Sequence, residues 1–319
     1  MYMFKYIMKR LGLMVMTFII IEIICFVLIK SLPVVIIVTI GQDADLIKEI
    51  LRSRGYYDPI PIQFWNYIVR IFTKWDFGVC YNLPEYRNQN IADVFGTHLP
   101  PTILLNVYST LFAVPIGIGL GIFAALKKNK WQDQTVSTLV MLTISVPSFV
   151  YAFLVQYLLC FLGGLPLTMK AGYDYFSPEM FVSMIPAILS LSFGSIAGYA
   201  RYTRAELTEV LTCEFMLLAR TKGLTKAQAV TRHALRNAMV PIFPSIVGEF
   251  VAVLSGSLII ENVFGVPGVG NLYLSSINSM DYDAFMFLSG FYIFVGLLAS
   301  IVIDLSYGVI DPRIRMGAR

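Results

Sequence analysis

The chain has 319 residues, of which 57% are hydrophobic and only 14% are charged, with a formal net charge of +4 and a mean hydropathy of +0.72. Soluble domains carry about 25% charged residues, so this composition excludes an ordinary soluble protein and predicts several membrane spans. Two histidines and four scattered cysteines, without a CxxC pair, give no reason to expect a metal site.

Six apolar stretches approach or exceed the roughly 20 residues that a helix needs to cross a bilayer. They lie at residues 11–31, 102–126, 135–163, 181–200, 242–261 and 284–306. The first stretch follows a basic start like that of a signal peptide, but it continues through Leu28 without a cleavage site, so we expect it to be retained. Pro115, Pro147 and Pro186 fall inside spans and are expected to bend them.

The placement of lysine and arginine predicts the orientation of these spans. If the N-terminus is cytoplasmic, the short inner segments hold 16 of the 24 basic residues. The positive-inside rule then places both termini and the loop 201–241 in the cytoplasm. The region between the first two spans lies outside and is rich in aromatic residues, which favours amphipathic helices and an interfacial aromatic belt. Its aromatic residues include Tyr56, Tyr57, Phe64, Trp65, Tyr67, Phe72, Trp75 and Phe77.

The loop 201–241 contains an organised basic segment, which we call the basic elbow (residues 214–241). Residues 214–222 are expected to form a short amphipathic helix that ends at Gly223. Thr225 and Gln228 have the spacing of a capping box, which predicts the start of a second helix. That helix is expected to turn Ala227, Val230, Ala234 and Leu235 inward.

From the residues alone, the elbow has simpler interpretations. Basic cytoplasmic loops commonly fix topology or meet anionic lipid headgroups. A helix-turn-helix that reads DNA does not fit, because both ends of the elbow are held close to the bilayer. No GxxxxGK[ST] loop occurs, and FGVPGVGN (264–271) lacks its lysine. Since GxSxG and HExxH are also absent from the sequence, we do not expect this chain to bind ATP or to be an enzyme.

Three acids, Glu22, Glu249 and Asp304, fall inside predicted spans. An intramembrane acid costs roughly 2.5–3.5 kcal/mol on insertion scales, so each is expected to be paired structurally or to serve a function. Asp304 lies near the cytoplasmic end of its span and can reach the interface. Glu249 could line a pathway. A proton relay through Glu22 and Glu249 would instead make the chain a proton-coupled secondary transporter, which is the alternative function.

Small residues form a stripe along the fourth span: Ser183, Ala187, Ser190, Gly194 and Gly198. Such a stripe allows close helix packing, and it could also form the weakly polar wall of a peptide pathway. The candidate pathway residues are Ser183, Ser190, Gly194 and Glu249.

The segment ARTKGLTKAQAVTRHALRNAMVP (219–241) resembles the signature loop of type I ABC-importer permeases, in their dipeptide/oligopeptide/nickel branch. Other segments resemble that branch in the same order along the chain. They are RGYYDPIPIQF (54–64), WDFGVC (75–80), HLPPTILL (98–105), ENVFGVPGVGNL (261–272) and DPRIR (311–315).

The resemblance implies an all-α membrane protein with six transmembrane helices and an extracellular insertion between helices 1 and 2. The implied organisation is a first segment and span (1–31), an extracellular region (32–97), a type 1 transmembrane domain (98–306) and a cytoplasmic tail (307–319). A coupling helix at about 214–226 would contact an ATPase. Its implied contact residues are Phe215, Leu217, Leu218, Ala219, Arg220, Lys222, Gly223 and Leu224. Leu217 and Leu218 stand where the broader superfamily has Glu-Ala, so this contact would be apolar.

The resemblance also implies the partners and the place of action. These are a second, related permease subunit in a heterodimer, two cytoplasmic ABC ATPase subunits that bind ATP and Mg, and an extracellular substrate-binding protein. The complex would lie in the lipid of the bacterial plasma membrane, with no nucleic acid and no cofactor or metal on this chain. The implied substrates are oligopeptides or dipeptides, with nickel chelates and glutathione-like molecules left open.

Overall fold

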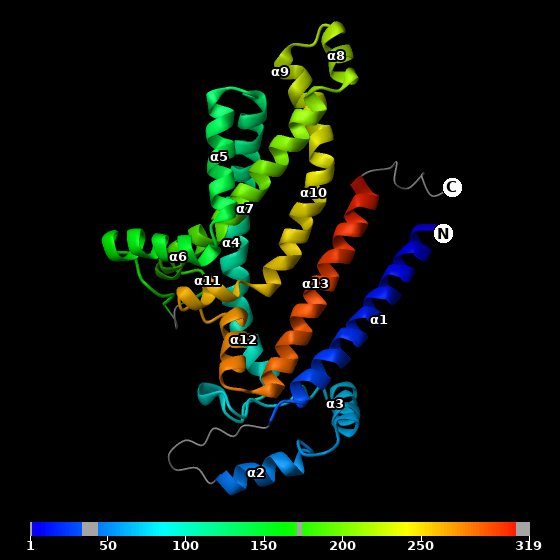
Figure 1. The fold of residues 1–319 in the computed structure, drawn as a ribbon, viewed down its shortest axis with the longest axis vertical. Helices are drawn as coiled ribbons and strands as arrows, with labels where there is room; N and C mark the ends of the chain where they lie inside the picture. Colours follow the sequence, from blue (N-terminus) through cyan, green and yellow to red (C-terminus); the bar gives the residue numbers. More distant parts are fainter. Residues whose placement is uncertain (1, 34–43, 171–173, 311–319) are drawn as a thin grey trace. The chain divides into compact units, whose positions relative to one another are not determined.

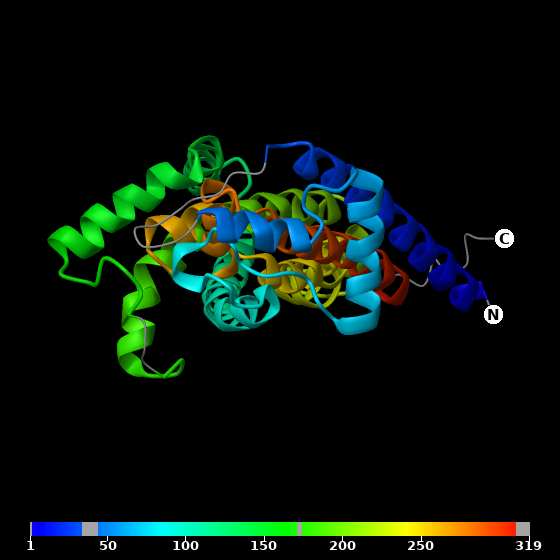
Figure 2. The ribbon, with the colours of Figure 1, turned by 90° about the horizontal axis from the view of Figure 1, so that it is seen from below.

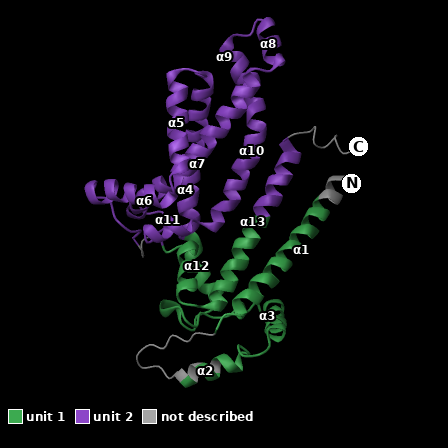
Figure 3. Ribbon diagram, in the orientation of Figure 1, with its two compact units in different colours: residues 1–100, 267–297 green, residues 101–266, 298–319 purple. Residues whose placement is uncertain are grey.

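The computed structural model describes residues 2–33, 44–170 and 174–310, and its regular structure is almost entirely helical (Figure 1). The described chain divides into two compact units (Figure 3). The first comprises residues 1–100 and 267–297, and the second comprises residues 101–266 and 298–319. The expected all-α membrane fold is confirmed.

Five helical stretches of the described residues are long and apolar enough to cross a membrane. They are Ile7–Lys30 in α1 (Tyr2–Lys30), α4 (Ile91–Leu126), α7 (Pro178–Leu211), Lys226–Ser255 around α10 (Leu235–Ala252), and α13 (Tyr282–Ile310). A bent helix pair passes the same test as a sixth span. All six predicted stretches overlap these elements, although the third and the fifth are interrupted. DPRIR and most of the predicted tail lie outside the described residues.

The third predicted span, 135–163, is not one straight helix. It consists of α5 (Trp131–Ser145) and α6 (Ser148–Val155), which continues as a π-helix (Gln156–Leu162), and the two parts meet at 103°. Figures 1 and 2 show α6 turning away from α5. Pro147 has no N–H and disfavours a helical residue before it, and Val146 accordingly has an extended backbone with φ −87° and ψ 127°. Pro115 and Pro186, by contrast, lie inside the continuous helices α4 and α7.

The fifth predicted span, 242–261, is wrong at its C-terminal end. After α10, a 3₁₀ turn (Val253–Ser255) leads to Gly256, whose φ of +67° stops the helix. Ser257 then begins α11 (Leu258–Val263), and its hydroxyl accepts a hydrogen bond from the N–H of Ile260 at 3.3 Å. The buried Glu261 lies on this separate helix, where one carboxylate oxygen accepts a bond from the Thr102 hydroxyl at 3.0 Å.

Close approach of α4 to α7 organises the second unit. A Cβ placed on Gly117 would lie 2.8 Å from the carbonyl oxygen of Ile196, and one on Gly121 would lie 2.6 Å from Cβ of Thr203. Glycines four residues apart therefore form a smooth face on α4, as in other closely packed membrane helices. Van der Waals contacts from such close packing hold the helices together, because the hydrophobic effect contributes little to the association of helices in lipid.

An ion pair joins α5 to α7 in the same unit. Arg204 binds Asp133 with two nitrogens, and Nη2 lies 2.8 Å from Oδ2. The same Oδ2 accepts a bond from the backbone N–H of Asn129 at 2.9 Å. The Asp133 side chain is buried while Arg204 is about one-third exposed. The bidentate geometry fixes the direction of Arg204 as well as its distance.

The first unit contains α2 (Ala44–Ser53), α3 (Ile60–Lys74), a 3₁₀ turn (Pro84–Tyr86) and α12 (Val269–Asn278). In this unit, the aromatic residues that were expected to form an interfacial belt are partly buried and partly exposed. Tyr56 and Tyr67 are buried in a cluster with Phe26 of α1, whereas Phe72 and Trp75 are 81% and 76% exposed. The region is therefore a folded unit with its own core, which also presents aromatic side chains on its surface.

Candidate functional site

The basic elbow has the local structure that its sequence predicts. Helix α8 (Glu214–Thr221) ends before Gly223, which has a φ of +88°. Helix α9 (Lys226–Ala229) begins with the predicted capping box. The N–H of Gln228 donates to Oγ1 of Thr225 at 3.3 Å, and the N–H of Thr225 donates to Oε1 of Gln228 at 3.0 Å. These bonds satisfy free donors at the start of α9 and fix where this helix begins.

The inner side of the elbow packs against the ends of α4 and α7. Met216 and Ala219 of α8 and Ala229 after the turn are buried together with Leu207. Ala227, which was expected to point inward, is exposed. A π-helix (Val230–Ala234) follows α9, and its wider turn shifts the helical phase, so that Ala229 faces inward instead. Val230 and Ala234 are buried and Leu235 is half-buried, as expected.

The outer side of α8 presents large apolar side chains that no described residue covers. Phe215, Leu217 and Leu218 are 40%, 67% and 55% exposed. Arg220 and Lys222 beside them are also exposed. The eight predicted coupling residues thus divide by position: these five and Gly223 lie on the surface, while Ala219 is buried and Leu224 is half-buried.

Four of the small residues predicted along the fourth span fall into two environments on α7. Ser183 and Ser190 are buried, and their hydroxyls donate to the carbonyl oxygens of Met180 at 2.7 Å and Pro186 at 2.8 Å. Gly194 and Gly198 are exposed and line a cavity of about 360 Å³ that is wide open to the surroundings and not enclosed by the described residues. Only the second half of the stripe therefore borders open space.

Glu249 of α10 lies in the same cavity as these two glycines. The hydroxyl of Ser195 donates to Oε1 of Glu249 at 2.8 Å, and the hydroxyl of Tyr199 donates to Oε2 at 3.5 Å. The structure thus brings Gly194 and Glu249 together and leaves Ser183 and Ser190 in the protein interior. Sequence reasoning missed Ser195 and Tyr199, which face Glu249 from α7.

The other two intramembrane acids have different surroundings. Glu22 of α1 is buried in the first unit, where Tyr67 donates to Oε1 at 3.5 Å. A Cβ on Gly290 would lie 3.3 Å from its carboxylate oxygens, so α13 also packs closely on this side chain. Asp304 is half-buried in α13. Oε2 of Glu22 is buried without a hydrogen-bond partner among the described residues, so Glu22 is paired at one oxygen only.

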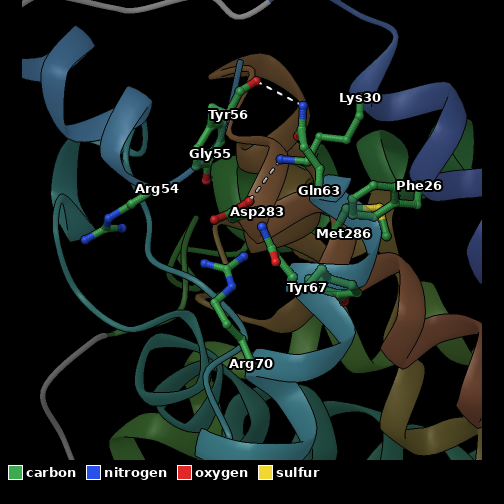
Figure 4. A pocket seen from close by; sticks show the side chains of 11 residues that line it. Phe26, Lys30, Arg54, Gly55, Tyr56, Gln63, Tyr67, Arg70, Asp283 and Met286 are labelled. Carbon is green, nitrogen blue, oxygen red and sulfur yellow. Dashed lines mark hydrogen bonds and ion pairs between the residues drawn. The ribbon is translucent and has the colours of Figure 1, made fainter. Parts of the chain in front are cut away.

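A second polar pocket lies in the first unit (Figure 4). Nζ of Lys30 lies 3.4 Å from Oδ1 of Asp283 and 4.1 Å from the centre of the Tyr56 ring. Figure 4 shows Arg70 reaching the same space from α3. Burial, with the negative charge of Asp283 as a lesser cause, raises the pKa of Tyr56 well above its usual range. The pocket has about 20 Å³ of free space, enough for a water molecule and too little for a peptide.

Asp281, just before α13, holds the 77–90 segment in place. Its Oδ2 accepts bonds from the backbone N–H groups of Asn82 at 2.7 Å and Leu83 at 3.1 Å. Burial raises the pKa of Asp281 to about 6, although these N–H donors act in the opposite direction. Among the described residues, no group of three or more His, Cys, Asp or Glu side chains could hold a metal ion.

Comparison with known proteins gives matches over nearly the whole chain. Residues 117–316 match the family described as binding-protein-dependent transport system inner membrane component, and residues 3–105 match its N-terminal membrane component. The dipeptide transport system permease protein DppB of Bacillus subtilis (strain 168) is 32% identical over 320 residues, which cover 98% of this chain and 99% of that protein. The glutathione transport system permease protein GsiC of Escherichia coli (strain K12) is 31% identical over 317 residues, with coverage of 98% and 99%.

A solved structure, the crystal structure of an amino acid ABC transporter with histidines, has a similar fold. The match has a TM-score of 0.50 and 20% sequence identity, and it covers 67% of this chain and 92% of the other.

Proposed function

The chain belongs to the family of binding-protein-dependent transport system inner membrane components, and on this basis we propose that it is one permease subunit of an ATP-driven peptide importer. Members of this family are membrane components of transport systems, so the chain is a transport subunit and not an enzyme. Relatives named for dipeptide and glutathione transport support short peptides as the substrate class. Oligopeptides remain within that class, because the length of the ligand depends on a binding protein outside this chain.

The observation that carries the proposal is the uncovered apolar surface of the basic elbow. Phe215, Leu217 and Leu218 project from α8, which packs on the ends of α4 and α7 through Met216 and Ala219. Burial of a side chain of this size stabilises a complex by about 1.5–3 kcal/mol. We assign this surface to a groove in a cytoplasmic ATPase subunit, with Arg220 and Lys222 at its edge.

The proposed complex contains this chain, a second related permease, two ATPase subunits that bind ATP and Mg, and an extracellular binding protein. Both termini and the elbow lie in the cytoplasm of a bacterium, as the placement of basic residues predicts. Residues 32–97 lie outside, residues 98–306 form the transmembrane domain, and residues 307–319 form the tail. The exposed Phe72 and Trp75 then belong to the outer surface, where the binding protein delivers its ligand.

The proposed mechanism is alternating access. ATP binding draws the two ATPase subunits together, and hydrolysis allows them to separate. Because α8 packs on the ends of α4 and α7 through Met216 and Ala219, its displacement moves these helices as rigid bodies. The transmembrane helices thereby open alternately to the two sides of the membrane.

The proposal is tested with purified complexes reconstituted in vesicles. A radiolabelled dipeptide, bound to the binding protein, is added on the side of the vesicle membrane that corresponds to the outside of the cell. We expect uptake that requires ATP and both ATPase subunits and is blocked by vanadate. A protonophore should leave this uptake intact, whereas it would stop a proton-coupled transporter that uses Glu22 and Glu249. Uptake by the permease pair without ATPase subunits would contradict the proposal.

A further inference from the structure

The cavity beside Glu249 is built entirely from α7 and α10. Its lining includes Gly194, Ser195, Gly198 and Tyr199 of α7 and Glu249 of α10, and its volume of about 360 Å³ is open to the surroundings on the side away from these helices. A volume of this order admits a small organic group and is far larger than the space needed by one water molecule.

Hydroxyl groups, and no cationic side chain of the described residues, contact the carboxylate of Glu249. Ser195 and Tyr199 each donate one hydroxyl to it, at 2.8 and 3.5 Å. In the described part of the chain, no lysine or arginine forms an ion pair with Glu249. A carboxylate has about four acceptor positions, so at least two remain for a ligand. A negative charge within a membrane span is costly, and it is stabilised when a cation binds there.

Packing against the described residues does not explain the glycines that border this cavity. A Cβ on Gly198 would meet nothing within 4 Å, and one on Gly194 would meet only the Tyr151 hydroxyl, at 3.4 Å. Gly117 and Gly121 of α4 behave differently, because a Cβ on either would collide with α7. Gly117 and Gly121 thus allow two helices to pack closely, whereas Gly194 and Gly198 leave space free beside Glu249.

We propose that Glu249 binds the ammonium group of the transported peptide, with Ser195 and Tyr199 holding the carboxylate in position. This assignment rests on the proposed function and adds a specificity determinant to it. An ammonium group donates up to three hydrogen bonds and carries the charge that the cavity lacks. Gly194 and Gly198 leave space for the chain that follows the ammonium group.

The ammonium group can come from the peptide N-terminus or from a lysine side chain. Both sources present the same chemistry to Glu249, and acetylation distinguishes them. Ala-Ala has only the terminal ammonium, N-acetyl-Ala-Ala has none, and N-acetyl-Ala-Lys has only the side-chain ammonium.

Binding is measured by saturation-transfer NMR on the complete permease and ATPase complex, without its binding protein, in nucleotide-free and vanadate-trapped forms. We expect wild-type complex to bind Ala-Ala at least about 10-fold more tightly than N-acetyl-Ala-Ala, a ratio equal to about 1.4 kcal/mol. Glu249→Gln should weaken binding of Ala-Ala by about the same factor and leave N-acetyl-Ala-Ala unchanged. Binding of N-acetyl-Ala-Lys as tight as that of Ala-Ala would identify any ammonium as the ligand, and weaker binding would identify the terminus.

Two further variants separate recognition from structure. Glu249→Asp keeps the charge and should keep the preference for the free amine. Thr143→Ala removes a hydroxyl of α5 that donates to the carbonyl oxygen of Leu139 on its own helix and lies outside the residues that line the cavity, so the preference should again be kept.

The inference fails if Glu249→Gln binds Ala-Ala like wild type, if it weakens both peptides equally, or if wild type binds no peptide in either form. If the two permease subunits of the Glu249→Gln variant separate on gel filtration, the carboxylate belongs to the subunit interface, and this result also overturns the inference. The proposed function is judged separately by ATP-driven uptake in wild-type vesicles. Normal wild-type uptake with an unchanged amine preference in Glu249→Gln would refute only the ammonium site.

Discussion

Three glycines of α4 lie within five residues, and the structure assigns them opposite responses to the same substitution. Gly117 and Gly121 face α7, whereas a Cβ on Gly119 would meet nothing within 4 Å. Replacing each glycine by alanine adds the same single methyl group to the same helix. The three variants therefore differ only in the surroundings of that group, which makes Gly119→Ala a matched control.

The expected magnitude follows from the atoms that the methyl group would meet. At position 121 they are the carbonyl oxygen of Ala200 at 2.7 Å and Cβ of Thr203 at 2.6 Å. Neither atom can rotate away, so α4 must move from α7. Overpacking of this kind costs about 1–3 kcal/mol. Gly119→Ala should instead be neutral or stabilising by up to about 1 kcal/mol, because alanine is the better helix former.

The assay is thermal unfolding of the detergent-solubilised complex, followed by the loss of its gel-filtration peak after heating. With about 2–4 °C per kcal/mol for a unit of about 150–250 residues, the range in which the second unit falls, Gly117→Ala and Gly121→Ala should each unfold several degrees below wild type. Gly119→Ala should unfold at or above the wild-type temperature. Equal temperatures for Gly119→Ala and Gly121→Ala would refute the packing of α4 on α7 described above.

Four more predictions concern the elbow, the α5–α7 ion pair and two thiols. Gly223→Val should reduce ATP-driven uptake more than membrane insertion, because a φ of +88° costs a side-chain-bearing residue about 1–2 kcal/mol or more; equal uptake per inserted complex would contradict this. Asp133→Asn should lower the unfolding temperature of the complex, since the change leaves Arg204 of α7 without its charge partner. Arg201→Lys, at an exposed position of α7, should leave the unfolding temperature unchanged. Cys80 should resist alkylation up to about pH 9, because burial raises its pKa to about 12 and only the thiolate reacts. Half-buried Cys213 should react with an impermeant maleimide in inside-out vesicles and not in right-side-out vesicles, and the reverse result would refute the proposed orientation.

The sequence predicts those features of this protein that arise from contacts close along the chain. The capping box of Thr225 and Gln228 and the left-handed Gly223 involve neighbouring residues, and the structure confirms them. The positions of the apolar stretches follow from composition for the same reason. Pro147 marks a bend in the sequence, but the 103° angle depends on how α6 packs on α7 and α11, which the local sequence does not encode.

The candidate site shows the same limit. The sequence identifies Glu249 as a candidate because it is an acid in an apolar stretch. It does not identify the partners Ser195 and Tyr199, because they are about 50 residues away in the chain. The small residues of the stripe on α7 cannot be told apart by their sequence pattern. The packing of neighbouring helices is what buries Ser190 and leaves Gly198 exposed. Ala227 was expected to face inward because the pattern assumed a regular α-helix, and the π-helix (Val230–Ala234) changes the phase.

The contact between α8 and an ATPase subunit is tested most directly by a photo-reactive amino acid at position 217, which is 67% exposed. In vesicles that import peptide with ATP, illumination should join this chain to an ATPase subunit. The same amino acid at position 57, where the residue is 52% exposed in the first unit, should give no ATPase product. A working complex that yields no ATPase product from position 217 would contradict the proposal that the basic elbow couples ATP hydrolysis to transport.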